Sequence, residues 1–380
     1  MKPLFFDVET TAKPLHDPFN PTAKLCYIGA DDGNYTDYAI EYFDVPYYDR
    51  LVSFQKRVDS CDLLVGANPK FDLTWGRRYG VVFTGKLVWD VLLVQFILDH
   101  QTTPLNSLND VAVRWGLRGK LDVVKTEYWD KGRQTMEVPE QILRDYLRQD
   151  VQLTKQIFYL QYDAVVERGI LPLVTLHNQD LRMLAEMEWN GNLYDVMGSE
   201  KKAMLLGSDI EATIKYLNTC APVAPRCWSN DFISQLLYGG TYKEVVKEPY
   251  LFTYKDGSTK EKLHNVIHER VLPQLVAHPK KGLKKEGFWP TDEATLKKLK
   301  TTGIATKIVQ YILELRRLEK LVGTYLSGFP SRIKESGWEG NLIHTNYNQA
   351  MAVTGRLSSV KPNVQNNPDE QKPYFISRFE

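Results

Sequence analysis

The stretch that decides the fold of this chain is Leu4-Phe5-Phe6-Asp7-Val8-Glu9-Thr10-Thr11, close to its start. Its apolar run predicts a short buried strand, and two carboxylates two positions apart interrupt that run. Because successive side chains on a strand point to opposite faces, Asp7 and Glu9 share one face with Phe5. Two buried carboxylates repel each other unless a cation lies between them. A strand end that runs into an acidic turn is the alternative interpretation of this stretch alone.

The composition is that of an ordinary globular protein. The 380 residues, of which 43% are hydrophobic and 25% charged, are enough for two or three domains. The formal net charge is +1, so any basic surface that binds nucleic acid must be local. Four scattered cysteines predict a reduced, cytoplasmic protein. We expect no signal peptide and no membrane part, because the longest apolar segment, Leu87–Leu98, is too short to span a bilayer.

Strand and helix patterns alternate in the first part of the chain. The segments Lys24–Ala30, Tyr38–Phe43 and Asp62–Ala67 are typical of strands, and Arg50–Val58 is typical of a helix. This order predicts an α/β domain with a mixed sheet.

A further acidic position follows the strand predicted over Asp62–Ala67. Asn68 is typical of a helix N-cap and Pro69 of a first helical residue, which places Asp72 one turn on, just beyond a strand end. Sites in α/β sheets form at such ends. Taken alone, Asp72 is more simply a solvated acid that complements the helix dipole. Asp90, ahead of the next apolar helix, is interpreted as an N-cap.

The helix predicted to begin at Pro139 carries polar side chains on its packing face. Tyr146 and Asp150 lie one turn apart, on or beside an apolar stripe. A carboxylate is rarely buried without a partner, and an ion pair with Arg144 or Arg148 is one way to supply it. The stripe consists of Leu143, Leu147, Val151, Thr154 and Phe158.

Four acids from distant segments thus fall where strand ends and helix faces would point them into one cleft. Hard oxygen ligands of this kind suit two Mg²⁺ or Mn²⁺ ions. Two such ions ~3.5–4 Å apart stabilise the attacking and the leaving oxygen of an in-line phosphoryl displacement. The four acids are Asp7, Glu9, Asp72 and Asp150.

The spacing of these acids resembles that of the DEDD-type 3′–5′ exonucleases, proofreading nucleases with a ribonuclease H-like fold. The resemblance implies that the four acids hold the metal ions, that Tyr146 orients the attacking water, and that Asn68 binds DNA by helping to hold the end of the DNA strand. A phenol with a pKa of ~10 is a poor base, so Tyr146 need only position the water. The matching patterns are Asp7-x-Glu9, Asn68-x-x-x-Asp72 and Tyr146-x-x-x-Asp150.

The rest of the chain is harder to interpret. The segment Glu188–Asp195 is typical of a helix end, a glycine stop and a short strand, so we place a domain boundary near residues 168–180. Gly239–Pro290 gives no clear pattern; its lysine pairs are more simply solvated than bound to nucleic acid. Lys307–Ile333 predicts one or two amphipathic helices.

The last motif, Thr354–Pro368, is dense in Arg, Ser, Asn and Gln, which can reach phosphates and minor-groove acceptors. Judged by residue chemistry alone, this composition is equally typical of a polar loop that binds nothing. As a pattern it resembles the family A DNA polymerases, where primer–template DNA meets the palm, and Lys320–Tyr325 resembles their thumb. The likeness is closest to the bacteriophage members, which implies a host cytoplasm. The DNA-contacting residues that it implies are Lys320, Arg356, Gln365 and Asn366.

The sequence departs from that family after Arg356. The acids that follow, Asp369, Glu370 and Glu380, lie in no motif of palm aspartates, and no fingers helix follows. We therefore expect a 3′–5′ exonuclease domain over residues 1–168 and a partial, mainly helical polymerase domain over residues 169–380. Either the polymerase is truncated, or a separate C-terminal chain supplies its palm and fingers.

The expected function is a two-metal 3′–5′ exonuclease that removes nucleoside monophosphates from single-stranded DNA 3′ ends. It would be joined to elements that bind primer–template DNA. Two alternatives stay open: a DNA-binding or assembly subunit of a split polymerase with little nuclease role, and a stand-alone exonuclease acting on RNA.

Overall fold

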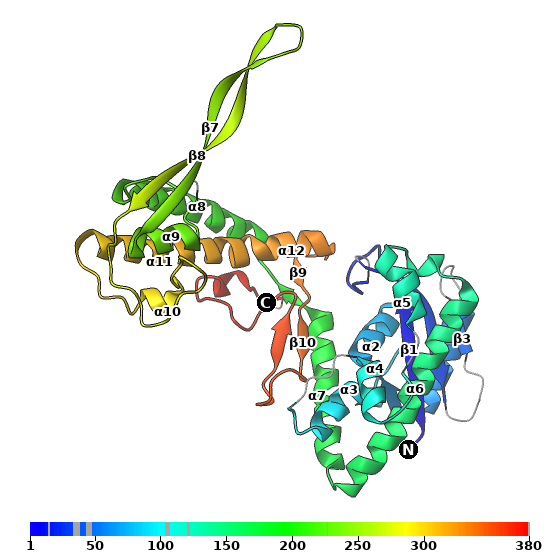
Figure 1. Cartoon of the computed structure of the whole chain (residues 1–380). Helices are drawn as coiled ribbons and strands as arrows, with labels where there is room; N and C mark the ends of the chain where they lie inside the picture. Colours follow the sequence, from blue (N-terminus) through cyan, green and yellow to red (C-terminus); the bar gives the residue numbers. More distant parts are fainter. Residues whose placement is uncertain are drawn as a thin grey trace. The chain divides into compact units, whose positions relative to one another are not determined.

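The computed structural model describes residues 1–13, 16–32, 39–42, 48–102, 107–119, 122–225 and 227–378 (Figure 1). They form two compact units. The first unit comprises Met1–Val196 and Phe329–Glu380, and the second unit comprises Met197–Gly328. The predicted boundary at residue 168 falls inside the first unit, between two of its helices. The compact units therefore divide the chain differently from the expected exonuclease domain (1–168) and polymerase domain (169–380), and that domain division stays a prediction.

A five-stranded sheet forms the centre of the first unit, in the order β3-β2-β1-β4-β5. The central strand β1 runs antiparallel to β2 and parallel to β4, so the predicted mixed α/β sheet is confirmed. Strand β3 continues the antiparallel side and β5 the parallel side. The strands are β1 (Pro3–Thr10), β2 (Leu25–Asp31), β3 (Ala39–Tyr42), β4 (Leu63–Gly66) and β5 (Leu87–Asp90).

Seven helices of the described residues accompany this sheet. The longest, α6, packs along β1 and β2 (Figure 1). Its buried residues include the apolar stripe that the sequence predicts, because a 3.6-residue period places those side chains on one face. The helices are α1 (Tyr48–Ser60), α2 (Pro69–Arg78), α3 (Val91–Leu98), α4 (Leu108–Arg114), α5 (Val123–Glu127), α6 (Glu140–Glu167) and α7 (Leu171–Asn190).

A close backbone approach brings α6 onto the sheet. Gly29 on β2 is the register partner of Asp7 on β1. A Cβ atom at Gly29 would lie 2.8 Å from Cγ of Leu147 on α6, inside any real contact distance. Glycine at this position therefore lets α6 lie against the strand pair that carries the first two acids.

The C-terminal segment of the chain also belongs to the first unit. Helix α7 ends at Gly191, which has a φ of 63°, as the predicted glycine stop requires. Strand β6 then pairs with β9, and β10 pairs with β11. The elements are β6 (Asn192–Leu193), α12 (Gly328–Ser336), β9 (Leu342–Ile343), β10 (Asn346–Asn348) and β11 (Ser358–Val360).

The second unit is mainly helical around its own core, in which Leu217, Phe232, Leu236, Ile308 and Ile312 are buried. In the described part of the chain, no helix of either unit is long and apolar enough to cross a membrane. The elements of the second unit are α8 (Val196–Cys220), α9 (Asn230–Tyr238), β7 (Gly240–Thr253), β8 (Thr259–Leu272), α10 (Glu293–Leu296), α11 (Gly303–Lys320) and a π-helical turn (Leu321–Leu326).

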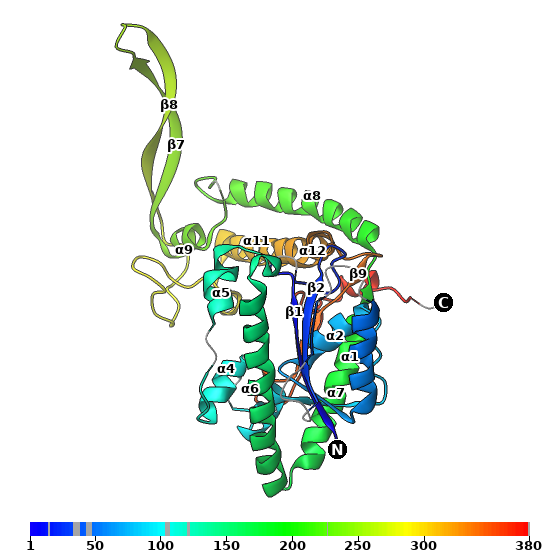
Figure 2. The same ribbon diagram turned by 90° about the vertical axis from the view of Figure 1, so that its right-hand side faces the viewer.

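Strands β7 and β8 form a long hairpin that extends away from the helices of the second unit (Figure 2). This hairpin occupies most of the segment in which the sequence showed no clear pattern. Its two faces both carry exposed side chains, such as Val245 and Ile267 on one and Tyr250 on the other. With no buried face, the strands lack the alternation of apolar and polar residues by which strands are recognised.

Candidate metal centre

The C-terminal half of β1 presents two acids on one face of the sheet. Asp7 is half-buried and Glu9 is buried, while Val8 between them points to the opposite face. The pairing of β1 with β2 becomes irregular just after Glu9, between Glu9 and Thr10. The two carboxylates therefore lie at the end of the central strand, as the alternation of β1 predicts.

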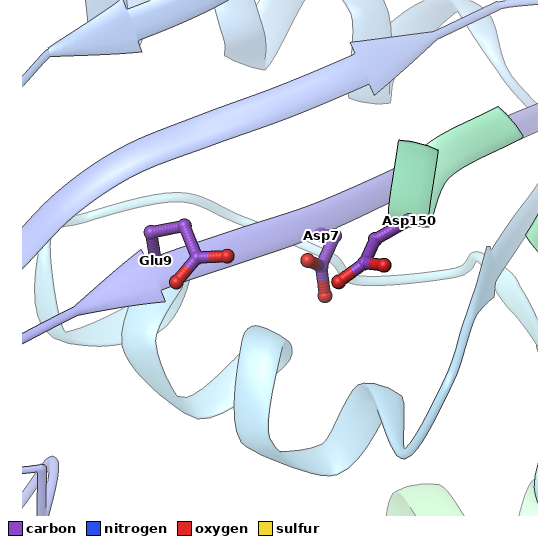
Figure 3. Close-up of side chains that lie close together, drawn as sticks. All are labelled: Asp7, Glu9 and Asp150. Atoms are coloured by element: carbon purple, nitrogen blue, oxygen red, sulfur yellow. The ribbon is translucent and has the colours of Figure 1, made fainter. Parts of the chain in front are cut away.

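Asp150 joins them from α6. One carboxylate oxygen from each of Asp7, Glu9 and Asp150 can be chosen so that all three lie within 4.8 Å of one another. We call these three residues the acid cluster. Figure 3 shows Asp150 descending from its helix beside Asp7, with Glu9 further along the same strand. Segments more than 140 positions apart thus meet at one point.

Asp72 on α2 borders the acid cluster. Its Oδ1 accepts a hydrogen bond of 3.0 Å from the backbone N–H of Val8, which lies between Asp7 and Glu9. The side chain is buried, and burial raises the pKa of Asp72 well above its usual range; the negative charge of Asp7 raises this pKa further. A cation nearby would reverse both effects, so Asp72 fits the edge of a metal site better than a solvated first helical turn.

Tyr146 lies one helical turn before Asp150, and its ring packs edge-on against Trp129 at 5.8 Å between centroids. Burial raises the pKa of the Tyr146 phenol, and the charges of Asp150, Glu9 and Asp7 raise it further. The phenol therefore stays protonated at neutral pH. It can donate a hydrogen bond to a water molecule but cannot act as a base.

The start of α2 differs from its predicted form. Asn68 occupies the N-cap position, and Pro69 is the first helical residue as predicted. However, Asn68 adopts the left-handed conformation, with φ 59°, and its side chain makes no capping hydrogen bond. Its backbone N–H instead donates to Oδ1 of Asp90 at 3.0 Å. The capping role predicted for the Asn68 side chain is wrong, because Asp90 satisfies this end of the helix.

Asp90 has two partners rather than one. Its Oδ1 accepts from the backbone N–H of Leu92 at 2.9 Å, which confirms the predicted N-cap of α3, and also from Asn68. Burial raises the pKa of Asp90 to about 6. The sequence indicates the local bond to Leu92, whereas the bond to Asn68, 22 residues away, has no sequence signal.

The arginines near Asp150 form ion pairs along their own helix. Arg144 pairs with Glu140 and Arg148 pairs with Asp145, all on exposed or half-exposed side chains. Asp150 lies on the opposite, buried side of α6 with Asp7. The structure therefore gives Asp150 the position expected of a cluster residue.

The residues present fit divalent cations. Three carboxylates within 4.8 Å, with a fourth at their edge, concentrate negative charge at a buried point. Such charge needs compensation, and an all-oxygen donor set favours Mg²⁺ or Mn²⁺ over softer metals. Asp7, Glu9, Asp150 and Asp72 are the residues that would hold such ions.

The remaining predicted residues lie away from the acid cluster or in the second unit. Arg356, Gln365 and Asn366 are exposed on the segment that follows β10. The backbone N–H groups of Gln365 and Asn366 both donate to Oδ1 of Asn363, which shapes the turn. Lys320 is exposed at the last residue of α11 in the second unit. Their predicted contacts with DNA stay predictions.

The structure contains a buried ion pair that the sequence does not indicate. Nζ of Lys70 on α2 contacts Oε1 of Glu188 on α7 and the carbonyl oxygen of Tyr347 on β10. The backbone N–H of Tyr347 donates to Glu188 Oε1 at 2.7 Å. Both charged side chains are only 8% exposed. Lys70 follows Pro69 in a first helical turn, where a lysine is ordinarily solvated, so its sequence position gave no signal of a partner 118 residues away.

Together, the mixed sheet, the acid cluster and the separate helical unit define a two-part protein with a candidate divalent-metal site. A family model described as DNA polymerase family A matches residues 253–377. This matched segment is thus similar to family A DNA polymerases over about a third of the chain.

Several bacterial proteins are similar to this chain. DNA polymerase I of Aquifex aeolicus is 22% identical over 98% of this chain and 55% of its own length. DNA polymerase I of Bacillus subtilis is 25% identical over 74% of this chain and 27% of its own length. DNA polymerase I of a Synechocystis strain is 43% identical over 23% of this chain and 8% of its own length. The chain therefore spans about half, or less, of the relatives it matches.

Among solved structures, the fold resembles one described as the POL domain of Pol1 from M. smegmatis in complex with DNA primer-template and dNTP. The TM-score is 0.69 at 16% sequence identity, and the match covers 98% of this chain and 55% of that chain. At this identity the likeness concerns the fold.

Proposed function

We propose that the first unit is a metal-dependent 3′–5′ exonuclease of ribonuclease H-like type, in a protein related to family A DNA polymerases. The observation that supports this most is the convergence of Asp7, Glu9 and Asp150 within 4.8 Å, with Asp72 bonded to the strand between them. A site of four carboxylates suits phosphoryl transfer, in which catalysis consists mainly of positioning and charge stabilisation.

Each residue has a defined part in this proposal. Asp7, Glu9, Asp150 and Asp72 hold the ions, which when bound lower the pKa of a water molecule and offset the charge of the phosphate. The protonated phenol of Tyr146 donates a hydrogen bond that orients this water. The bond between Asp72 and the Val8 N–H fixes α2 against β1, so that the acids keep their spacing without the ions.

DNA is the proposed substrate, entering as a single-stranded 3′ end. The similar proteins are DNA polymerases, and the solved neighbour is described in complex with DNA primer-template. Arg356, Gln365 and Asn366 are exposed, which suits contacts with a primer–template duplex. Degradation of a DNA oligonucleotide beside an RNA oligonucleotide of the same sequence separates this substrate from RNA.

The test removes two acids that share one strand. The variant Asp7→Ala with Glu9→Ala should degrade a single-stranded DNA oligonucleotide at least about a hundredfold more slowly, because it loses several kcal/mol of charge stabilisation. Its binding of DNA without divalent metal should change little. A matched control is Asp163→Ala with Glu167→Ala, which removes two exposed acids of α6. Equal rates for the two double variants would contradict the proposal.

A second candidate rests on the family match over residues 253–377. In this proposal the chain contributes to nucleotidyl transfer by holding primer–template DNA, and nuclease activity matters little. Tight binding of primer–template by the Asp7→Ala, Glu9→Ala variant, together with a wild-type nuclease rate no higher than that of this variant, would favour it. Two expectations stay predictions: that a further chain supplies the palm and fingers, and that the protein comes from a bacteriophage.

A further inference from the structure

The first unit contains a cavity whose lining includes none of the residues of the acid cluster. It is a cavity of about 780 Å³, within the usual size range of ligand sites. Its walls come from Lys13, residues 16–20, the start of α2, α12 and the segment around β10 and β11. Its polar lining includes Lys13, Asn68, Lys70, Arg332 and Lys361.

The cations of this cavity outnumber the acids that could neutralise them. Within the described residues, no ion pair joins Lys13, Arg332 or Lys361 to a carboxylate. Lys70, by contrast, is neutralised by Glu188. We call Lys13, Arg332 and Lys361 the cavity cations.

The acids of the wall are mostly engaged elsewhere. Oδ1 of Asp17 accepts from the backbone N–H of Phe19 and Oδ2 accepts from Nε1 of Trp338, each at 2.9 Å. Glu188 is held by Lys70 and the Tyr347 N–H. Glu335 is exposed on α12. With Lys70 and Glu188 cancelling each other, the three cavity cations face the two acids Asp17 and Glu335, so the lining keeps a net charge of +1 (three minus two).

Besides the excess of positive charge, the guanidinium nitrogen of Arg332, unpaired in the described part of the chain, indicates that the cavity binds an anion. Its Nε is buried and has no hydrogen-bond partner among the described residues, although the guanidinium lies 5.6 Å from the centre of the Trp338 ring. A buried charged donor without an acceptor is costly. A planar guanidinium fork matches the oxygens of a phosphate, which could supply the missing acceptor.

One helix connects this cavity with the acid cluster. Asn68, Lys70, Phe71 and Thr74 of α2 line the cavity, while Asp72 of the same helix bonds to β1. The cavity and the edge of the acid cluster are therefore built on the same helix.

We propose that the cavity binds phosphate groups of nucleotides through Lys13, Arg332 and Lys361. These phosphates belong either to the backbone of the single strand whose end is cleaved or to a free nucleoside monophosphate. This inference rests on the proposed nuclease function for its substrate class, but it concerns a separate set of residues.

The test measures binding without catalysis. The whole chain, in EDTA, is titrated against a fluorescent dT12 oligonucleotide at several salt concentrations. Each contact with a single-strand phosphate contributes ~0.7 to the slope of log K against log salt. The triple variant Lys13→Gln, Arg332→Gln, Lys361→Gln should therefore lose about 2 from this slope. The matched control Lys24→Gln, Lys56→Gln, Lys334→Gln removes three exposed cations outside the cavity and should keep the wild-type slope.

Competition with dTMP and with inorganic phosphate separates the two sources. A slope lost only in the cavity variant indicates strand phosphates. An unchanged slope with weaker binding of dTMP indicates a mononucleotide. An unchanged slope and unchanged affinities for dTMP and phosphate overturn the proposal. Lys13→Gln with Lys361→Gln alone, both at exposed positions, should lose about 1.4 from the slope if the triple variant does not fold.

Failure of the proposed nuclease gives a different result. In that case wild-type protein with Mn²⁺ does not shorten the oligonucleotide, whereas the slope difference in EDTA still decides the cavity proposal.

Discussion

Two single carboxylates are buried in the first unit with raised pKa values. Asp72 and Asp90 are both buried near the start of α2, and burial raises the pKa of each. Both accept backbone N–H groups, but their charged neighbours differ: the charge of Asp7 raises the pKa of Asp72, whereas that of Lys70 lowers the pKa of Asp90. A cation would therefore lower the pKa of Asp72 by offsetting the charge of Asp7, while protein donors already act in this direction on Asp90.

The raised pKa of Asp90 predicts a pH-dependent stability. Its pKa is about 6 in the folded protein against a usual 3.8, so ionisation favours the unfolded chain as the pH rises. Between pH 4 and pH 7 the wild-type free energy of unfolding should fall by about 2 kcal/mol relative to that of Asp90→Asn. Urea titrations of both proteins across this range measure the difference. Parallel stability profiles for the two proteins would contradict the expectation.

Tyr146 should affect the rate of cleavage and not the binding of metal. In the proposed mechanism, the change Tyr146→Phe would remove one hydrogen bond to the attacking water. Such a bond is worth about 1.5–3 kcal/mol, so kcat should fall about tenfold to a hundredfold. Single-turnover cleavage of an oligonucleotide measures this rate, and titration with Mn²⁺ checks that the affinity for metal stays the same. Tyr159→Phe on the exposed side of α6 is the control; equal rates would exclude an orienting role for Tyr146.

At the scale of elements, the site depends on how closely α6 approaches β2. Leu147 rests on Gly29, and the next helical turn brings Asp150 to Asp7. Thus a glycine with no side-chain chemistry of its own affects the distance between two acids of the cluster.

An added methyl group should disturb this contact. Gly29→Ala should lower the free energy of unfolding by about 1–3 kcal/mol, because the Cβ meets Leu147 at 2.8 Å. With Leu147→Ala added, the loss should be smaller than the sum of the two single losses. Gly207→Ala is the control, since nothing lies within 4 Å of its added Cβ and alanine favours a helix. Additive losses in urea titrations would mean that the two positions do not interact.

Periodicity determines which elements the sequence could predict. Strand β1, helix α6 and the Asp90 cap were predictable, because each leaves a local pattern of burial or of capping. The β7–β8 hairpin was not, since both of its faces are exposed. The Lys70–Glu188 pair and the Asp90–Asn68 bond were not either, because long-range pairing leaves no mark on local spacing.

At the scale of the whole molecule, the family match crosses the division into compact units. Residues 253–377 include part of the second unit and most of the C-terminal segment of the first. The buried Lys70–Glu188 pair holds this C-terminal segment to α2 through Tyr347. Candidate nuclease and polymerase-like segments thus share one folded body.

Breaking this pair on one side should be costly. Lys70→Met leaves Glu188 buried without its cation and should lower the free energy of unfolding by about 3–5 kcal/mol at pH 8. Burial raises the pKa of Glu188, so the unpaired carboxyl takes up a proton in acid and the loss should shrink at pH 5. Urea titrations at both pH values measure it.

Controls separate the buried pair from ordinary surface charge. The double variant Lys70→Met, Glu188→Gln should lose less than Lys70→Met alone, because no buried charge is left over. Lys131→Met breaks an exposed pair on α5 and its following turn and should cost at most about 1 kcal/mol. Equal losses for Lys70→Met and Lys131→Met would show that the pair is not desolvated.

The first unit is built from two stretches of chain, and the rings of Tyr194 and Phe329, near the two junctions, lie 5.5 Å apart between centroids. We therefore expect that the 132 residues from Met197 to Gly328 can be deleted without unfolding the first unit. A few glycines in their place should leave a minimal protein that keeps Lys70, Glu188 and Tyr347 together. A protein cut off at Val196 would instead leave the Lys70–Glu188 pair without Tyr347, and it should misfold or aggregate.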